Sequence, residues 1–243
     1  MVRFAVSDCW ARNKDGLRRF REIESSPIQT GIIEKDNMMK WRGEGKIDKQ
    51  NGGVGLFARC VLEMEPHTPD AGILFVNAIT GGKISAEYVS AIETGVREAA
   101  ANGVLAGYPV VDIKVTLLDG AMHAVDSNPT VFRQAAILAF REAASLAPMV
   151  ILEPIALLNL ETPREYMGGV IADIMRRRGG IQGQEYSGDN VTVSALIPLA
   201  ETVGGYATAL RSLTQGRASY TLTPVGYDET PRRIQERIIS MRA

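Results

Sequence analysis

Residues that could carry acid–base or nucleophilic chemistry are scarce in this sequence. The 243 residues include two histidines and two cysteines, too few for a disulfide framework or a metal cluster. His123 stands close to Asp126 and Ser127, which are the residue types of a hydrolytic triad. Three neighbours on one loop rarely reach triad geometry, because a separate element must orient the base. The sequence therefore predicts no catalytic residue and no metal site.

Two Gly-Lys pairs, Gly45-Lys46 and Gly82-Lys83, are the candidates for a loop that binds nucleotide phosphates. Isoleucine follows each lysine, and neither pair has the upstream glycine of the G-x-x-x-x-G-K-[ST] pattern. That pattern supplies the backbone N–H groups and the lysine that bind the phosphates. We therefore expect no bound GTP and no other cofactor.

The charge balance indicates local rather than general contacts with a polyanion. The chain has 27 basic and 28 acidic residues and a net charge of −1, whereas a nucleic-acid-binding protein usually has a basic face. All basic residues after position 151 are arginines, which indicates a domain boundary near residue 150. No apolar run reaches the roughly 18 residues of a membrane span. Asp8 interrupts the first apolar stretch, so a signal peptide is not expected. These features predict a soluble, cytoplasmic protein without a membrane partner.

Apolar periodicity predicts the elements of the first 150 residues. Residues 1–45 are polar without clear strand alternation, and a helix over 15–24 is the one element expected there. Further along, the patterns predict three strands and two helices: strands over 56–65, 73–78 and 109–118, and helices over 86–102 and 129–145. A turn-rich loop at 119–128 separates the last strand from the last helix.

The remaining residues follow the order β-α-β-β-α-β, which is the ferredoxin-like arrangement. The expected strands are 151–160, 180–185, 191–198 and 220–226, and the expected helices lie between 162 and 178 and over 205–215. Thr162–Glu165 has the sequence of a capping box with proline at the first helical position, which predicts the start of the first helix.

A short amphipathic helix is expected at the end of the chain. Ile234, Ile238 and Met241 form its apolar face, and its other face carries three arginines, Arg232, Arg233 and Arg237. So narrow an apolar face does not stabilise a helix by itself, so the helix must dock on another part of the protein. It contains no Trp, Phe or Leu, which disfavours binding to a membrane surface.

Seven segments, in order along the chain, carry a resemblance to one family. They are GEGK with KQNGG (43–53), FVNAITGG (75–82), LAGYPVVD (105–112), GAMHAVDS (120–127), LEPI (152–155), RRRG (176–179) and GGYAT with LRSLTQGRA (204–218). Together they resemble the fourth and fifth domains of bacterial translation elongation factor G, over residues 43–243.

The resemblance implies an α+β fold class with two domains. A ribosomal-protein-like α/β domain with a left-handed βαβ crossover would span 43–150, and a ferredoxin-like domain would span 151–228. The helix at 229–243 would pack back on the first of these domains. Residues 1–42 stay unassigned.

The implied function is that of a ribosome-binding protein in tRNA–mRNA translocation. The chain would lack a GTPase domain of its own and would therefore not be an enzyme. Its expected partners are rRNA, the tRNA–mRNA of the ribosomal A site and, as a further candidate, a separate GTPase-domain chain. Two alternatives stay open: a ribosome-associated regulatory or protection module, and a non-functional fragment of a longer factor.

The resemblance also implies site residues. Contacts at the decoding site would come from Gly81, Gly82, Lys83, His123 and Asp126. Contacts with rRNA would come from Arg176, Arg177, Arg178, Arg211 and Arg217. The arginines are also consistent with cations at helix C-termini and with solvated surface. His123 matches the histidine of the family's G-S-Y-H-D-V-D-S motif. Met122 replaces the motif's aromatic residue and Ala124 its acidic one, which disfavours stacking on a base. The archaeal and eukaryotic relatives modify a histidine near this position, but the glycine-rich sequence that follows it there is missing here, so no modification is expected.

Overall fold

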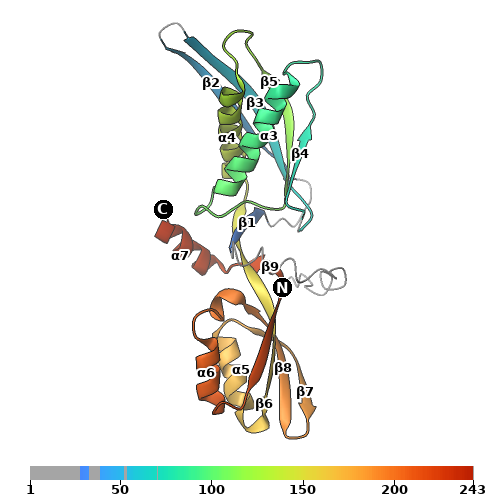
Figure 1. Ribbon diagram of the computed structural model, residues 1–243, viewed down its shortest axis with the longest axis vertical. Helices are drawn as coiled ribbons and strands as arrows, with labels where there is room; N and C mark the ends of the chain where they lie inside the picture. Colours follow the sequence, from blue (N-terminus) through green and yellow to red (C-terminus); the bar gives the residue numbers. More distant parts are fainter. Residues whose placement is uncertain (1–27, 33–38, 52–53, 70, 243) are drawn as a thin grey trace. The chain divides into compact units, whose positions relative to one another are not determined.

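The computed structural model describes residues 28–32, 39–51, 54–69 and 71–242, which form two compact units (Figure 1). The N-terminal unit comprises Ile28–Leu152 together with Glu229–Ala243, and the C-terminal unit comprises Glu153–Asp228. The helix expected over 15–24 lies outside the described residues. Both units combine one sheet with helices, which confirms the α+β fold class.

The N-terminal unit is a four-stranded sheet with two helices on one face (Figure 1). Its strands are β2 (Trp41–Asn51), β3 (Val54–Pro66), β4 (Ile73–Asn77) and β5 (Ile113–Ala121), and its helices are α3 (Ala86–Asn102) and α4 (Pro129–Leu146). The strand order is β2-β3-β5-β4. Strands β4 and β5 are parallel and α3 connects them, so they form a βαβ unit. The core between sheet and helices contains Phe132 and Phe140 of α4.

Strand β2 was not expected from the sequence, because glycine occupies two positions of its buried face. Gly43, Gly45 and Ile47 alternate toward α4 and are buried, but only Ile47 is apolar enough to mark the pattern. A Cβ at position 45 would lie 1.8 Å from the carbonyl oxygen of Ala135, and one at position 43 would lie 2.1 Å from that of Ala139. The GEGK motif therefore allows the backbone of α4 to approach the strand.

Strand β5 lies further along the chain than the 109–118 that the pattern predicts. Its last residues, Asp119–Ala121, pair with Arg59–Val61 of β3, so the strand continues through Gly120 into the expected loop. Its expected first residues are not part of it, because Asp112 has a left-handed backbone with φ of 56°.

Residues 108–111 instead bond to a short strand that the sequence did not predict, β1 (Gln29–Ile32). The N–H of Thr30 donates to the Pro109 carbonyl at 2.8 Å, and the carbonyl of Thr30 accepts from the Val111 N–H at 2.9 Å. β1 also pairs with Met149–Leu152. The LAGYPVVD motif thus contributes backbone hydrogen bonds that fix β1.

The C-terminal unit has the ferredoxin-like order, as predicted. Its elements are β6 (Met149–Pro163), η1 (Arg164–Tyr166), α5 (Met167–Arg176), β7 (Gly180–Ser187), β8 (Asn190–Pro198), η2 (Leu199–Glu201), α6 (Tyr206–Thr214) and β9 (Ser219–Glu229). Strand β6 starts in the N-terminal unit, and within the C-terminal unit the sheet order is β9-β6-β8-β7. One face of this sheet packs on α5 and α6 around Leu158, Ile174 and Leu210.

The capping box expected at Thr162–Glu165 is wrong. Strand β6 continues to Pro163, and Thr162 pairs with Val191 of β8 and is buried. A 3-10 turn over Arg164–Tyr166 then precedes α5, and no side chain caps it. Pairing with β8 extends the strand through the residues whose local sequence favours a helix start.

The terminal helix α7 (Arg232–Arg242) docks on the N-terminal unit. Gln235 is buried, and its side-chain oxygen accepts the Ile151 N–H at 3.1 Å while its nitrogen donates to the Thr230 carbonyl at 2.7 Å. The guanidinium of Arg242 lies 4.3 Å from the ring centroid of Tyr108. The polar side chain of Gln235 thus contributes to the docking of α7, which we expected because the narrow apolar face does not stabilise the helix by itself. No helix in the described ranges is long and apolar enough to span a membrane.

We expect Gly45→Ala to lower the free energy of unfolding by about 2–3 kcal/mol, because the new Cβ overlaps the backbone of α4. Urea denaturation followed by circular dichroism measures the change. Gly183→Ala on the exposed strand β7 is the matched control, because a Cβ there meets no atom within 4 Å. Equal effects of the two substitutions would contradict the close approach of α4 to β2.

Candidate nucleic-acid interface

Two loops lie together at one end of the N-terminal unit's sheet (Figure 1). Residues 78–85 join β4 to α3, and residues 122–128 join β5 to α4. We call these two loops the tip. Ile84 is buried against Gly120, where a Cβ would lie 2.1 Å from the Ile84 Cδ1 atom. Helices α3 and α4 both begin at the tip, so their partial positive charges lie there.

The second tip loop is held by hydrogen bonds to strand β3. The Ser127 hydroxyl accepts the His123 N–H at 2.8 Å and donates to the Phe57 carbonyl at 2.7 Å. The Phe57 N–H donates to the Asp126 carbonyl at 2.8 Å. The side chain of Asp126 fits against Gly55, where a Cβ would lie 2.4 Å from the carboxylate. The loop therefore has a defined conformation although its residues are mostly exposed.

The imidazole of His123 is oriented and accessible. Its Nδ1 atom lies 3.0 Å from Oδ2 of Asp126, and 61% of the side chain is exposed. The ring of Phe57 lies edge-on at a centroid distance of 6.2 Å. The structure thus brings together His123 and Asp126, both predicted site residues. Ser127, the third residue of the triad pattern, uses its hydroxyl to hold the loop.

The first tip loop carries the other predicted residues of this group. Gly81 and Gly82 have φ of 77° and 68°, a backbone conformation that favours glycine. Lys83 forms an ion pair with Asp119 at 2.8 Å, and 59% of its side chain is exposed. Arg59 lies on the other side of Asp119, at 3.1 Å. The Lys83 and Arg59 side chains together lower the pKa of Asp119 to about 2.

Two exposed apolar side chains of the tip were not predicted as site residues. Val125 is 86% exposed and Met122 is 44% exposed. Both stand on the loop of His123, where no core requires them. The sequence signal that could have found them is an apolar residue inside a loop that also contains Gly and Asp. This signal points to an exposed site only once the loop is known to project from the sheet.

The arginine run of the C-terminal unit is largely engaged within the protein. Arg178 makes two hydrogen bonds to the buried carboxylate of Glu153, at 2.6 and 2.8 Å, and one to Glu201 at 2.9 Å. Arg177 bonds to Asp173 at 2.9 Å and to the Glu201 carbonyl at 2.8 Å. These partners hold the end of α5 against η2. The side chains of Arg177 and Arg178 are therefore mostly covered.

The other predicted arginines are more accessible. Arg176 also bonds to Asp173, but 73% of its side chain is exposed. Arg217 pairs with Glu165 and lies over the ring of Tyr166, 4.7 Å from its centroid. Arg211 is exposed on α6, and the described residues supply no ion-pair partner for it. Contact of these arginines with rRNA stays a prediction, for which Arg176 and Arg211 are the best placed.

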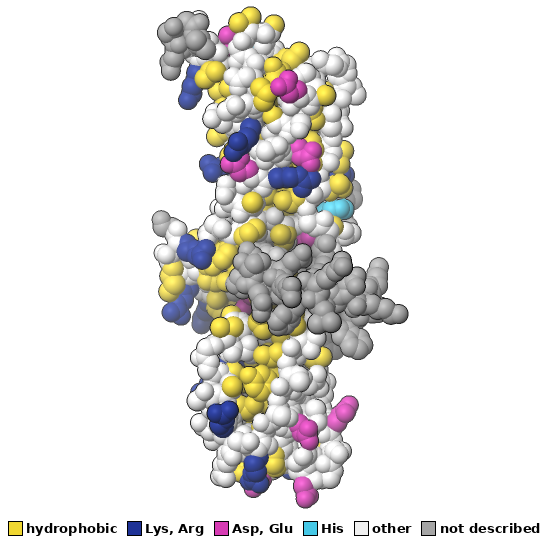
Figure 2. Space-filling model, in the orientation of Figure 1, with side chains coloured by type: hydrophobic (Ala, Val, Ile, Leu, Met, Phe, Trp, Pro, Cys, Tyr) yellow, Lys and Arg dark blue, Asp and Glu magenta, His cyan; other side chains and the backbone are white. Residues whose placement is uncertain are grey.

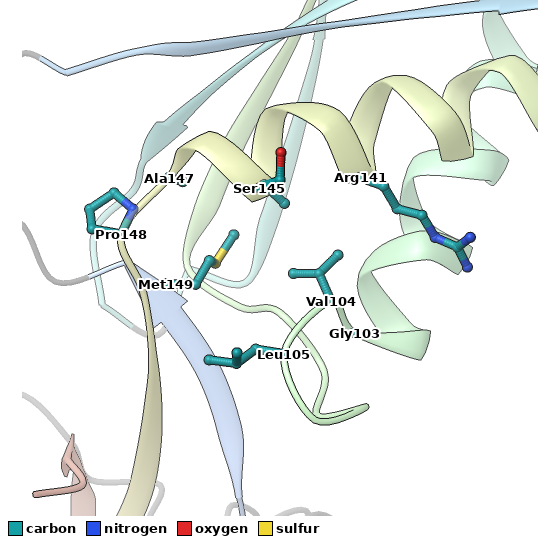
Figure 3. Close-up of a pocket in the computed structure, with 9 residues that line it drawn as sticks. Gly103, Val104, Leu105, Arg141, Ser145, Ala147, Pro148 and Met149 are labelled. Carbon is teal, nitrogen blue, oxygen red and sulfur yellow. The ribbon is translucent and has the colours of Figure 1, made fainter. Parts of the chain in front are cut away.

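A hollow of about 600 Å³ lies elsewhere in the N-terminal unit, between the C-terminal end of α4 and residues 103–105 (Figure 3). The side chains of Val104, Leu105 and Met149 face it, whereas the guanidinium of Arg141 points away. Its lining offers no convergent polar groups that would orient a small ligand. Within the described ranges, no group of His, Cys, Asp and Glu side chains could hold a metal ion.

Comparison with sequence families assigns both units. Residues 31–148 match the family described as "Elongation factor G, domain IV", and residues 150–238 match "Elongation factor G C-terminus". The two units are thus those of a translation elongation factor. The chain belongs to the elongation factor G family, of which it carries domain IV and the C-terminal domain. The match to domain IV begins at residue 31, inside β1. This residue belongs to the N-terminal segment 1–42, which the sequence patterns left unassigned.

Individual relatives agree with this assignment. The chain is 45% identical over 229 residues to the elongation factor G of Aquifex pyrophilus, which covers 94% of this chain and 33% of that protein. A crystal structure of a Thermus thermophilus protein superposes with a TM-score of 0.76 at 40% identity, over 89% of this chain and 32% of that one. The chain therefore spans about a third of the length of these relatives.

We expect Lys83→Met to raise the pKa of Asp119, because the Lys83 hydrogen bond is the largest cause of its shift from 3.8 to about 2. A carboxyl whose pKa is lowered on folding stabilises the protein above its ordinary pKa, and this stabilisation is lost as the pH falls from 3.8 to about 2. Carbon-13 NMR of the carboxyl group measures the titration. Lys46→Met is the control, because Lys46 pairs with Asp48 instead. Titration of the wild-type carboxyl at its ordinary value would contradict the ion pair.

We expect Arg178→Met to lower the free energy of unfolding by about 3 kcal/mol, because it leaves the buried carboxylate of Glu153 without its cation. Arg176→Met should cost less than about 1 kcal/mol, because Arg176 is exposed and Asp173 keeps Arg177 as a partner. Urea denaturation of both variants tests the difference. A larger loss of unfolding free energy for Arg176→Met than for Arg178→Met would contradict the assignment of Arg178 as the partner of the buried Glu153.

Proposed function

We propose that this chain binds the ribosome and that its tip contacts the tRNA–mRNA of the A site during translocation. The family assignment supports a role in translation. The observation that carries the finer proposal is the tip itself. Two loops from different parts of the sequence meet at one end of the sheet. Both expose side chains, although hydrogen bonds and an ion pair hold the loops in place.

The chemistry of the tip suits single-stranded or distorted RNA. With Nδ1 donating to Asp126, the neutral imidazole of His123 has Nε2 free to accept from a ribose 2′-OH, and a protonated ring would donate to a phosphate. The exposed apolar side chains of Met122 and Val125 can cover the face of an unstacked base. Lys83 uses Asp119 for one of its three donors and can direct the others toward a phosphate.

In this proposal the chain binds the ribosome and does not hydrolyse GTP. The sequence has no phosphate loop, and the matched families cover domain IV and the C-terminal domain. The energy of GTP hydrolysis would have to come from another domain or from a separate GTPase-domain chain.

We expect the wild-type chain to compete with a complete elongation factor G in a ribosomal translocation assay, and His123→Ala to compete several-fold less well. The substitution removes an exposed side chain, so the thermal unfolding midpoint should not change. His67→Ala is the matched control, because His67 follows the opposite end of β3 and its N–H bonds to the Asp112 carbonyl.

Two results would contradict the proposal for the tip. One is a folded His123→Ala variant that competes as well as the wild type. The other is equal weakening by His67→Ala, which would show that the site of contact is not the tip.

A further inference from the structure

Helix α7 carries more positive charge than its contacts within the protein use. It has four arginines and one glutamate. Arg232 pairs with Glu236 at 3.0 Å, and Arg242 lies over Tyr108 and donates to the Ala106 carbonyl at 3.2 Å. Arg233 and Arg237 are exposed, and the described part of the chain provides no ion pair for either. Two guanidinium groups are therefore available on one helix.

The docking of α7 determines where these two arginines point. Residues of an α-helix follow one another at about 100° around its axis. Arg233 and Arg237 consequently lie about 160° on either side of Gln235, the buried residue of the helix. The two hydrogen bonds of Gln235 to Ile151 and Thr230 fix the rotation of the helix. Both arginines are thus directed away from the body of the unit, one helical turn apart.

We propose that the outer face of α7, formed by Arg233 and Arg237, binds the phosphate backbone of rRNA. This proposal rests on the proposed function, because it requires that the chain bind the ribosome. It adds a second contact of the N-terminal unit, separate from the tip. Guanidinium groups bind phosphate oxygens through paired, charge-assisted hydrogen bonds. Because the helix is already fixed, the contact costs little ordering of the backbone.

The composition of the outer face favours RNA over other partners. Figure 2 shows Lys and Arg side chains gathered over α7. Ser240, Glu236 and Met241, which is 69% exposed, complete the exposed surface beside the two arginines. A protein partner would normally bury an apolar or aromatic anchor at the centre of the contact, whereas the two arginines occupy the centre here and the exposed Met241 lies one turn beyond Arg237, near the end of the helix. A membrane surface would require large apolar side chains on the opposite face, which is docked on the protein.

The test is the salt dependence of binding to purified bacterial 70S ribosomes, measured by co-sedimentation of the full chain between about 50 and about 200 mM KCl. Loss of two phosphate contacts in Arg233→Gln/Arg237→Gln should reduce the slope of log affinity against log salt by about 1.4–1.8. Over this range the wild type would then lose about tenfold more affinity than the variant. Arg233→Lys/Arg237→Lys keeps the charges and should keep most of the slope.

The matched control is Arg97→Gln/Arg133→Gln, which removes the same charge from α3 and α4, where both arginines pair with glutamates. A photoreactive benzoylphenylalanine at Ser240, which is exposed on α7, should crosslink to rRNA. A wild-type salt slope in Arg233→Gln/Arg237→Gln overturns the proposal for α7 alone. So does a crosslink to a ribosomal protein. Absence of any ribosome binding by the wild-type chain overturns the proposed function and this proposal together.

Discussion

The close contact between helix α4 and strand β2 is the constraint on which the N-terminal unit depends. Gly43 and Gly45 leave room for the helix backbone, so that Ala135 and Ala139 lie directly on the strand. A side chain at either glycine would push the helix away from the sheet and open the core around Phe132 and Phe140. Because α4 begins at the tip, this contact also fixes the position at which the loop of His123 ends.

The tip combines exposure with order, which suits a surface that must meet a large partner. Ile84 anchors the first loop in the core, but the exposed side chains of the second loop contribute little buried area. Hydrogen bonds hold that loop: the Ser127 hydroxyl joins it to β3, and Asn128 caps α4 by accepting the Val131 N–H at 3.0 Å. The Lys83–Asp119 pair orients the other loop. Because the tip is already ordered, less conformational entropy is lost when it binds a partner.

In the C-terminal unit, burial decides which arginines are free to act on a partner. Three consecutive arginines point in different directions around the end of a helix, so they cannot share one role. Arg178 has a left-handed backbone with φ of 63°, which turns its side chain onto the buried Glu153. Arg177 lies 5.0 Å from the ring centroid of Tyr206. Arg176 alone of the three stays open to solvent.

The sequence by itself determined most of the helices and strands, the ferredoxin-like order and the family. Period-two and helical patterns marked β3, α3 and β8, because in these elements most buried positions carry an apolar residue. Strands β1 and β2 were missed, because Gly43 and Gly45 hide the alternation of one and Thr30 is held by hydrogen bonds rather than by apolar packing. His123 and Lys83 were predicted as site residues through the family resemblance, and Val125 was not.

Only the tertiary structure decided how far β5 and β6 extend, because pairing with β3 and β8 overrides the local preference for a loop or a helix start. It also decided which cations have partners. An arginine in a sequence carries the same charge wherever it folds. Whether that charge faces a buried carboxylate, as in Arg178, or solvent, as in Arg233, depends on residues that are distant along the chain.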